Sequence, residues 1–264
     1  YTINHQMDRI LQDIYRKKPD FVGFSCYIWN IGMVKDIVRE LAKILPETRI
    51  WLGGPEVSYN AEELLEEMPF ITGIMVGEGE VTFHELLMFY RQGGPEDIRG
   101  LEQTDGIVFR KRGQEGICRT RDRALTDISR LPFFYNEADI GDFHNRILYY
   151  ESSRGCPYRC SYCLSSIDKT VRLRRLELVE KELQFFLEKK VPQVKFVDRT
   201  FNCNHSHAMG IWRFIKEQDN GITNFHFEIS ADILTEEEIT LLQSLRPGLV
   251  QLEIGVQSTN PVTI

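Results

Sequence analysis

The chain has 264 residues, with 32 Lys or Arg and 39 Asp or Glu, so its formal net charge at pH 7 is -7. This length suffices for two domains or for one large barrel, and the acidic balance argues against nucleic acid as the main partner. No apolar run reaches the roughly 18 residues that cross a bilayer, and the N-terminus lacks a secretory pattern. We therefore expect a soluble, cytoplasmic protein in a reducing compartment, without a membrane partner.

Residues 1–95 alternate between helical and extended patterns. Apolar residues at helical spacing predict helices over about 7–15, 34–45, 61–68 and 82–91. Short apolar runs predict buried strands at 21–25, 49–52 and 73–76. This alternation predicts an α/β domain with a doubly wound, Rossmann-like parallel sheet, whose ligands bind at the carboxyl ends of the strands.

Small residues follow each of these strands. Ser25 ends the first strand, Gly53 and Gly54 follow the second, and Gly77-Glu78-Gly79 follows the third. A turn from strand to helix can require glycine without any ligand. The same edge of a parallel sheet is also where a cofactor can lie against the backbone, so the turns by themselves leave both readings open.

Residues 96–145 interrupt the helical rhythm, and we expect them to connect two domains. The segments 106–110 and 116–119 flank a Lys-Arg-Gly-Gln turn and predict a β-hairpin. An apolar loop follows at 131–135. The single Cys118 of the hairpin is more typical of a small, half-buried residue than of a metal ligand.

Residues 146–264 predict part of a (β/α) barrel. Strands are expected at 146–152, 194–197, 225–229 and 249–254, with helices over about 176–189, 209–218 and 236–245 between them. The chain begins at Tyr1 without a methionine and ends at Ile264, just past the fourth strand. We therefore expect a piece of a longer protein, in which the barrel is truncated after about four strands.

Three cysteines, Cys156, Cys160 and Cys163, lie in one loop directly after the first strand of this half-barrel. A cubane iron-sulfur cluster normally takes four cysteines, so three thiolates leave one iron open to another ligand. A structural zinc site needs four ligands, and the run has no adjacent histidine at a usual zinc spacing. Six cysteines in all are too sparse and scattered for a disulfide framework. The spacing favours a cluster, with zinc and incidental thiols as the alternatives.

The run from Cys156 to Cys163, with Tyr162 before the last cysteine and Arg154-Gly155 before the first, resembles the signature of the radical S-adenosylmethionine (SAM) superfamily. The resemblance implies a [4Fe-4S] cluster whose open iron binds SAM, and it implies the partial barrel of that superfamily. One electron from an external reductant of the flavodoxin or ferredoxin type would then cleave SAM to a 5′-deoxyadenosyl radical. The cofactors carry this chemistry, while the protein binds and orients them.

The same resemblance assigns cofactor contacts at the strand ends. Tyr162 lies at the aromatic position of the signature, and Glu228 aligns with an acidic position that faces SAM in related enzymes. The turn Gly255-Val-Gln-Ser258 is similar to the ribose-contacting turn of the superfamily, with Gln257 as the donor to the ribose hydroxyls. Asp198, at the end of the second strand, is a candidate either to line the substrate cavity or to form a structural ion pair.

Ser25, Gly53-Gly54 and Gly77-Glu78-Gly79 together resemble the cobalamin-binding domain that often precedes a radical SAM domain. The resemblance implies that these residues let the nucleotide tail of cobalamin approach the backbone. The Asp-x-His-x-x-Gly motif with which some such domains ligate cobalt is absent from the sequence. The predicted function is a cobalamin-associated radical SAM enzyme, with methyl transfer among the reactions it implies. The alternatives are a methylthiotransferase-like radical SAM enzyme without cobalamin and a non-catalytic iron-sulfur or electron-transfer module.

Overall fold

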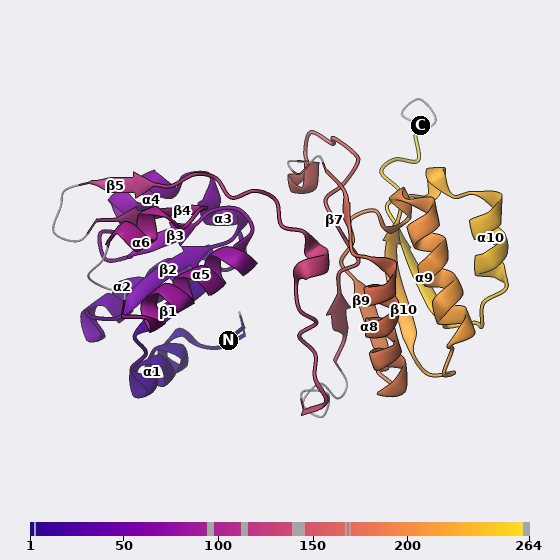
Figure 1. Cartoon of the computed structure of the whole chain (residues 1–264), viewed down its shortest axis with the longest axis horizontal. Coiled ribbons are helices and arrows are strands. Elements are labelled where there is room, and N and C mark those ends of the chain that lie inside the picture. The colour runs from indigo at the N-terminus through magenta and orange to yellow at the C-terminus, as the bar shows by residue number, and fades with distance from the viewer. Residues whose placement is uncertain are drawn as a thin grey trace. The chain divides into compact units, whose positions relative to one another are not determined.

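The computed structural model describes residues 1–2, 4–93, 98–111, 116–138, 146–166, 168 and 170–260. The chain divides into two compact units, Tyr1–Thr126 and Asp127–Ile264, each with its own hydrophobic core (Figure 1). The predicted domain boundaries at residues 95 and 145 lie outside the described residues. Within the described ranges, no helix combines the length and the apolar composition needed to cross a membrane.

Unit 1 is built on a five-stranded sheet in the order β1-β2-β3-β4-β5. The first three strands pair in parallel, and β4 and β5 form an antiparallel hairpin on the edge of β3. The predicted hairpin is therefore present and extends the first sheet, although its turn lies outside the described residues. The strand bounds are β1 Phe21–Ser25, β2 Arg49–Gly53, β3 Gly73–Met75, β4 Ile107–Arg110 and β5 Ile117–Arg119.

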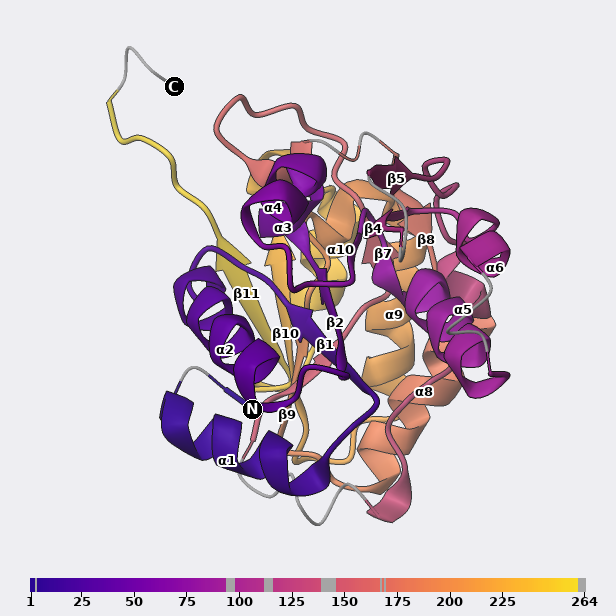
Figure 2. The ribbon, with the colours of Figure 1, turned by 90° about the vertical axis from the view of Figure 1, so that its left-hand side faces the viewer.

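Helices cover both faces of this sheet, because successive side chains of a strand point to opposite faces. Ile50, Leu52 and Ile74 pack in one core with α1, α2 and α4, whereas Trp51 and Met75 pack in a second core with α5 and α6. Figure 2 shows α1 and α2 side by side. The doubly wound arrangement predicted from the sequence is confirmed. The helix bounds are α1 Met7–Lys17, α2 Ile31–Ile44, α3 Pro55–Ser58, α4 Ala61–Glu67, α5 Gly79–Arg91 and α6 Ile98–Glu102.

Unit 2 is built on a four-stranded parallel sheet in the order β6-β9-β10-β11. Because the strand order follows the chain and such crossovers are right-handed, the connecting helices lie on one face of the sheet (Figure 1). This is the predicted partial barrel. Its elements are β6 Leu148–Tyr150, α8 Leu176–Glu188, β9 Gln193–Phe196, α9 His205–Glu217, β10 Asn224–Ile229, α10 Glu236–Gln243 and β11 Val250–Ile254.

The two faces of this second sheet differ in polarity. On the helix side, Phe196, Phe225 and Phe227 pack with Trp212 of α9 in a fully buried core. Alternation along the strands places a polar set on the opposite face, namely Tyr149, Lys195, His226, Glu228, Gln251 and Glu253. The uncovered face is therefore suited to polar ligands and not to a second apolar layer.

A buried ion pair fastens the first strand of unit 2 to its first helix. Arg174 donates from Nε to Oε2 of Glu182 on α8 over 2.8 Å, and both side chains are less than a tenth exposed. The hydroxyl of Tyr150 on β6 donates to the same oxygen over 2.6 Å. Arg174 also donates to the carbonyl of Leu131 over 2.9 Å, so the pair holds the incoming segment as well.

Replacement of Glu182 by Gln should lower the free energy of unfolding by about 3 kcal/mol, because it leaves the Arg174 guanidinium buried without a countercharge. Chemical denaturation followed by circular dichroism measures the loss. Glu188→Gln, on the exposed end of the same helix, is the matched control and should change stability by less than about 0.5 kcal/mol. Equal losses in the two variants would contradict the assignment.

Candidate functional site

The cysteine loop of unit 2 is closed at its base by a two-stranded ribbon. Strand β7, Ser153–Arg154, pairs antiparallel with β8, Arg172–Leu173. Gly155 starts the loop at φ 101°, and a Cβ at this position would lie 2.2 Å from the carbonyl oxygen of Thr170. Glycine is therefore required here for packing as well as for its backbone conformation.

From this base the loop reaches the carboxyl ends of other strands in the same sheet. The hydroxyl of Tyr158 donates to Oγ of Ser230, directly after β10, over 3.2 Å. The hydroxyl of Tyr162 donates to Oε1 of Gln257, beyond β11, over 3.4 Å. The structure thus brings two predicted cofactor contacts, Tyr162 and Gln257, together across 95 residues of sequence. The loop lies at the strand ends, where parallel α/β folds place their active sites.

The three cysteines of the loop lie in different surroundings. Cys156 is buried, whereas Cys160 and Cys163 are exposed, and the backbone NH of Cys163 donates to the carbonyl of Cys160 over 3.1 Å. Among the described residues, no three side chains of His, Cys, Asp or Glu form a group that could hold a metal ion as they stand. Three cysteines on one loop with a fixed base nevertheless supply the kind of donor that an iron-sulfur cluster takes.

The base of the loop rests on the carboxylate of Asp198, which follows β9 and is completely buried. Its Oδ2 accepts a hydrogen bond from the backbone NH of Ser152 over 3.0 Å. Its Oδ1 accepts from the hydroxyls of Ser152 and Ser153 over 2.6 and 2.7 Å. Burial raises the pKa of Asp198 to about 6, against the effect of these hydrogen bonds. Of the two roles expected for Asp198, neither is observed, because it is sealed from any cavity and its partners are hydroxyls and an NH.

Glu228 lies on the polar face of the sheet. Its carboxylate is 3.3 Å from Nζ of Lys195, which also lies 3.0 Å from Glu253. The hydrogen bond to Glu253 and the ion pair with Glu228 raise the pKa of Lys195. Among the described residues, Glu228 makes no hydrogen bond with Tyr162, so these two candidates are held by different partners.

The remaining candidate of unit 2, Ser258, follows Gln257 after β11. Its Oγ accepts a hydrogen bond from the backbone NH of Asn260 over 3.1 Å. This contact lies within the turn itself. A hydroxyl that accepts this bond can still donate one, and Ser258 donates no hydrogen bond to the other described residues.

In unit 1, the predicted turns lie together at the carboxyl ends of β1, β2 and β3. The hydroxyl of Ser58 donates to the carbonyl of Gly54 over 2.8 Å and accepts from the NH of Gly77 over 3.4 Å, so it links two of the turns. Gly54 has φ 106°, and a Cβ there would lie 2.6 Å from the carbonyl oxygen of Cys26. Packing therefore explains why a glycine stands at position 54, next to the buried Gly53. The exposed Ser25 accepts a hydrogen bond at its carbonyl from the side chain of Asn30.

Gly77 and Gly79 face open space. A Cβ built on either residue would meet no atom within 4 Å. The backbone conformation of Gly77, with φ 80°, itself favours glycine, whereas at Gly54 neighbouring atoms also exclude a Cβ. Glycines that are not needed for packing leave room for a ligand against the backbone, so the turn after β3 fits the close approach of a cofactor.

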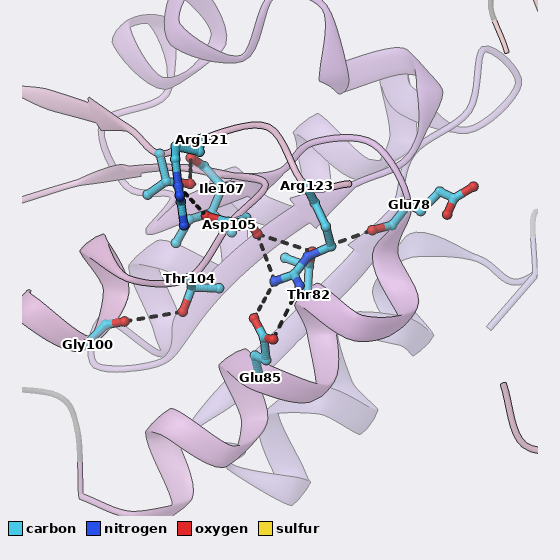
Figure 3. A network of polar contacts seen from close by, with 10 residues as sticks. Glu78, Thr82, Glu85, Gly100, Thr104, Asp105, Ile107, Arg121 and Arg123 are labelled. Atoms are coloured by element: carbon cyan, nitrogen blue, oxygen red, sulfur yellow. Dashed lines mark hydrogen bonds and ion pairs between the residues drawn. The ribbon is translucent and has the colours of Figure 1, made fainter. Parts of the chain in front are cut away.

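Glu78, between these two glycines, has a structural partner. Its Oε2 accepts a hydrogen bond from the NH of Thr126 over 2.9 Å. Figure 3 shows how the segment leading to Thr126 is fastened to α5: Nε of Arg123 donates to Oγ1 of Thr82 over 2.7 Å, and its guanidinium pairs with Glu85. The carboxylate of Glu78 therefore helps to fix this segment beside the turn.

A cavity of about 530 Å³ lies beside β1, the edge strand of the sheet. Ser25, Tyr27 and Trp29 contribute to its wall, which is mostly apolar. The rings of Tyr27 and Trp29 stack with their centroids 4.6 Å apart. Of the predicted cofactor contacts in unit 1, Ser25 lines this cavity and none of the glycines does, so the cavity lies at the β1 end of the group of turns.

Two family matches agree with this arrangement. Residues 1–87 match the B12 binding domain, and residues 150–263 match the Radical SAM superfamily. The chain is therefore a radical SAM superfamily protein with a B12-binding domain ahead of its radical SAM domain. The domain combination implies cobalamin for the first domain, and a [4Fe-4S] cluster with SAM for the second.

Known proteins resemble most of this chain. An uncharacterized methyltransferase of Pyrococcus horikoshii is 26% identical over 257 residues, which are 96% of this chain and 54% of that protein. The cobalamin-dependent radical SAM methyltransferase TokK of Streptomyces tokunonensis is 27% identical over 70% of this chain and 28% of its own length. The solved structure of the enzyme OxsB, with aqua-cobalamin and SAM bound, has TM-score 0.76 and 20% identity, and it matches 97% of this chain and 38% of that one. The chain thus spans about half or less of these proteins, and OxsB shows the fold alone.

The buried carboxylate of Asp198 predicts a pH dependence of stability. Its pKa of about 6 in the folded chain exceeds the ordinary 3.8. Protonated Asp198 therefore stabilises the folded state at low pH, and this contribution is lost as pH rises through 6. Relative to Asp198→Asn, the free energy of unfolding of the cluster-free protein should fall by about 1–1.5 kcal/mol from pH 5 to pH 7.5. Denaturation at several pH values measures this difference.

The matched control is Asp219→Asn. The hydrogen bond from Arg246 lowers the pKa of Asp219 below its ordinary 3.8, so its stabilisation is lost only as pH falls through that lower value. Between pH 5 and pH 7.5 the difference between wild type and Asp219→Asn should therefore stay constant. A constant difference for Asp198→Asn as well would contradict the pKa shift of Asp198.

Proposed function

We propose that this chain forms the cofactor-binding part of a cobalamin-dependent radical SAM enzyme that transfers a methyl group. The observation that supports it most is the three-cysteine loop, fixed at its base and laid over strand ends, in a chain that also carries a B12-binding domain. Two relatives named as methyltransferases, those of Pyrococcus horikoshii and Streptomyces tokunonensis, support methyl transfer as the reaction class.

In this proposal, each candidate site residue of unit 2 binds a cofactor. Cys156, Cys160 and Cys163 hold the cluster and leave one iron open for SAM. Tyr162 and Gln257, already joined by a hydrogen bond, contact the nucleoside together with Ser258. Glu228 faces the methionine or ribose end, with its charge balanced by Lys195. When bound, the cluster and SAM supply one-electron cleavage chemistry, and cobalamin supplies a methyl carrier.

In unit 1, the turns at the strand ends receive the cobalamin tail. Gly77 and Gly79 offer the open backbone surface, and Glu78 keeps the neighbouring segment in place. Gly54 keeps the backbone of the turn after β2 free of a side chain, because a Cβ there would lie 2.6 Å from the carbonyl oxygen of Cys26, and Gly53 beside it packs against Met75. Ser25 contributes an exposed hydroxyl at the edge of the group.

We also propose a partner and a setting. The cluster needs an external one-electron donor of the flavodoxin or ferredoxin class. A cytoplasmic, reducing environment is supported by the six cysteines of the chain, none of which forms a disulfide bond in the structure. We propose no specific substrate, because the residues that select it come from the shape of the loops and are not fixed by the fold.

The cluster assignment is tested with Cys160→Ala and the control Cys118→Ala. Cys118 is a half-buried thiol on β5 in the other unit. After anaerobic reconstitution, Cys160→Ala should lose at least about nine-tenths of SAM cleavage, because one of three cluster ligands is gone. Release of 5′-deoxyadenosine under reduction, with iron content, measures the loss. Wild-type iron content and cleavage in Cys160→Ala would refute the assignment.

The cobalamin assignment is tested with Gly79→Ala. Gly79 begins α5 with open space around it, so alanine should raise stability by up to about 1 kcal/mol. The same methyl group should weaken retention of hydroxocobalamin several-fold, because it fills the surface proposed for the cofactor. Corrin absorbance after gel filtration measures retention.

Gly32→Ala is the matched control, since Gly32 lies in the first turn of α2, also with open space around it. It should raise stability comparably and leave cobalamin retention unchanged. Retention by Gly79→Ala equal to that of wild type would reject the contact at Gly79. If wild-type protein retains no corrin, cobalamin binding by this chain is itself wrong.

A further inference from the structure

Thr200 makes a contact with the cysteine loop that the sequence did not indicate. It lies just beyond β9, is 5% exposed, and places its Oγ1 3.5 Å from Sγ of Cys156. A buried hydroxyl is normally hydrogen-bonded. Among the described residues, the sulfur of Cys156 is the partner that this side chain has. Cys160 and Cys163 are exposed, so the first cysteine is distinguished by this contact.

The direction of this hydrogen bond is fixed once the sulfur is a ligand. A cysteine that binds iron has lost its proton, so only the Thr200 hydroxyl can donate. A donor pointed at a cluster sulfur stabilises negative charge, and the reduced cluster carries one more electron than the oxidised cluster. Hydrogen bonds to the sulfurs are among the features that set reduction potentials of such clusters.

The position of Thr200 is enforced by its surroundings. Asp198, two residues earlier, is tied by three hydrogen bonds to Ser152 and Ser153 at the base of the same loop. Two residues later, Nδ2 of the buried Asn202 donates to the carbonyl of Ser230 over 2.9 Å. Thr200 is thus held between two anchored residues, which fix its backbone beside Cys156.

We propose that Thr200 is a positioning residue for the first cluster ligand, and that its hydrogen bond to the Cys156 sulfur makes the cluster easier to reduce by one electron. The electron comes from the external donor, and no bond to Thr200 forms or breaks. This inference rests on the proposed function, because it requires that the three cysteines hold a cluster.

The test compares four forms of the full chain after anaerobic reconstitution: wild type, Thr200→Val, Thr200→Ser and Thr223→Val. Valine removes the hydroxyl at nearly constant volume, whereas serine keeps it. Thr223 is fully buried, accepts a hydrogen bond from Asn220 over 2.9 Å, and precedes β10 at the amino end of the sheet. Thr223→Val therefore controls for loss of a buried hydroxyl far from the strand ends where the loop lies. Redox titration followed by electron paramagnetic resonance gives the midpoint potential, and iron and sulfide analysis gives the loading.

Thr200→Val should load iron like wild type and shift the midpoint to a more negative potential. The equilibrium constant for one-electron reduction of the cluster should fall roughly three- to tenfold, and a tenfold fall corresponds to a shift of 59 mV. Thr200→Ser and Thr223→Val should titrate like wild type. Failure of Thr200→Val alone to load, with loading restored by serine, would also support the positioning role.

An unchanged midpoint in Thr200→Val, or an equal shift in Thr223→Val, would overturn the inference while the proposed function stands. Loss of loading in both Thr200→Val and Thr200→Ser would overturn it too, because the hydroxyl would then not be the determining group. Absence of a cluster in wild-type protein would instead refute the proposed function, and the inference with it.

Discussion

The carboxylate of Asp198 is the contact on which the geometry of the cysteine loop depends. It is completely buried and joins the residues after β9 to those after β6, where the loop begins. A buried carboxylate is costly unless its oxygens are hydrogen-bonded, and here an NH and two hydroxyls satisfy it. Separating the ends of β6 and β9 would leave the buried carboxylate without these hydrogen bonds, and this penalty holds the two strand ends together. Every other contact of the loop is made from this fixed base.

The two sheets differ in the surfaces that they offer to ligands at their strand ends. In unit 1, helices cover both faces of the sheet, and glycines leave open space at the strand ends, as at Gly77 and Gly79. In unit 2, helices cover one face, and the other carries charged side chains such as Lys195 and Glu228. The first arrangement suits a ligand lying along the backbone. The second suits a polar ligand above an open sheet.

Local patterns of the sequence were enough to predict the strands of the two main sheets, because apolar runs and glycine breaks are properties of neighbouring residues. The two-residue strands β7 and β8 were not predicted, since neither contains an apolar run. Helix starts were less accurate: α5 begins at Gly79 and not near Thr82, since an early polar turn gives no apolar periodicity. The hairpin was predicted from its own residues, but its pairing with β3 depends on a partner some thirty residues earlier. The cysteine loop was recognised from the spacing of its cysteines together with Arg154, Gly155 and Tyr162, because all of these residues are close in sequence.

The supporting residues of the site could not be predicted in the same way. Tyr158 and Ser230 are 72 residues apart, and nothing in either segment signals the other. Asp198 was a candidate because it is a polar residue at the end of a strand. Its burial and its hydroxyl partners could not be predicted, because they depend on the pairing of β6 with β9. Glu78 was expected at the cofactor, and the structure shows that it also binds the NH of Thr126.

The central claim is that three thiolates hold a cluster with one iron left for SAM. Mössbauer spectroscopy of the full chain, reconstituted with ⁵⁷Fe and measured with and without SAM, tests it most directly. The account predicts four irons per chain, one of which changes its isomer shift when SAM is added. Four irons whose spectra are identical with and without SAM, or a chain that incorporates no cluster, would contradict it.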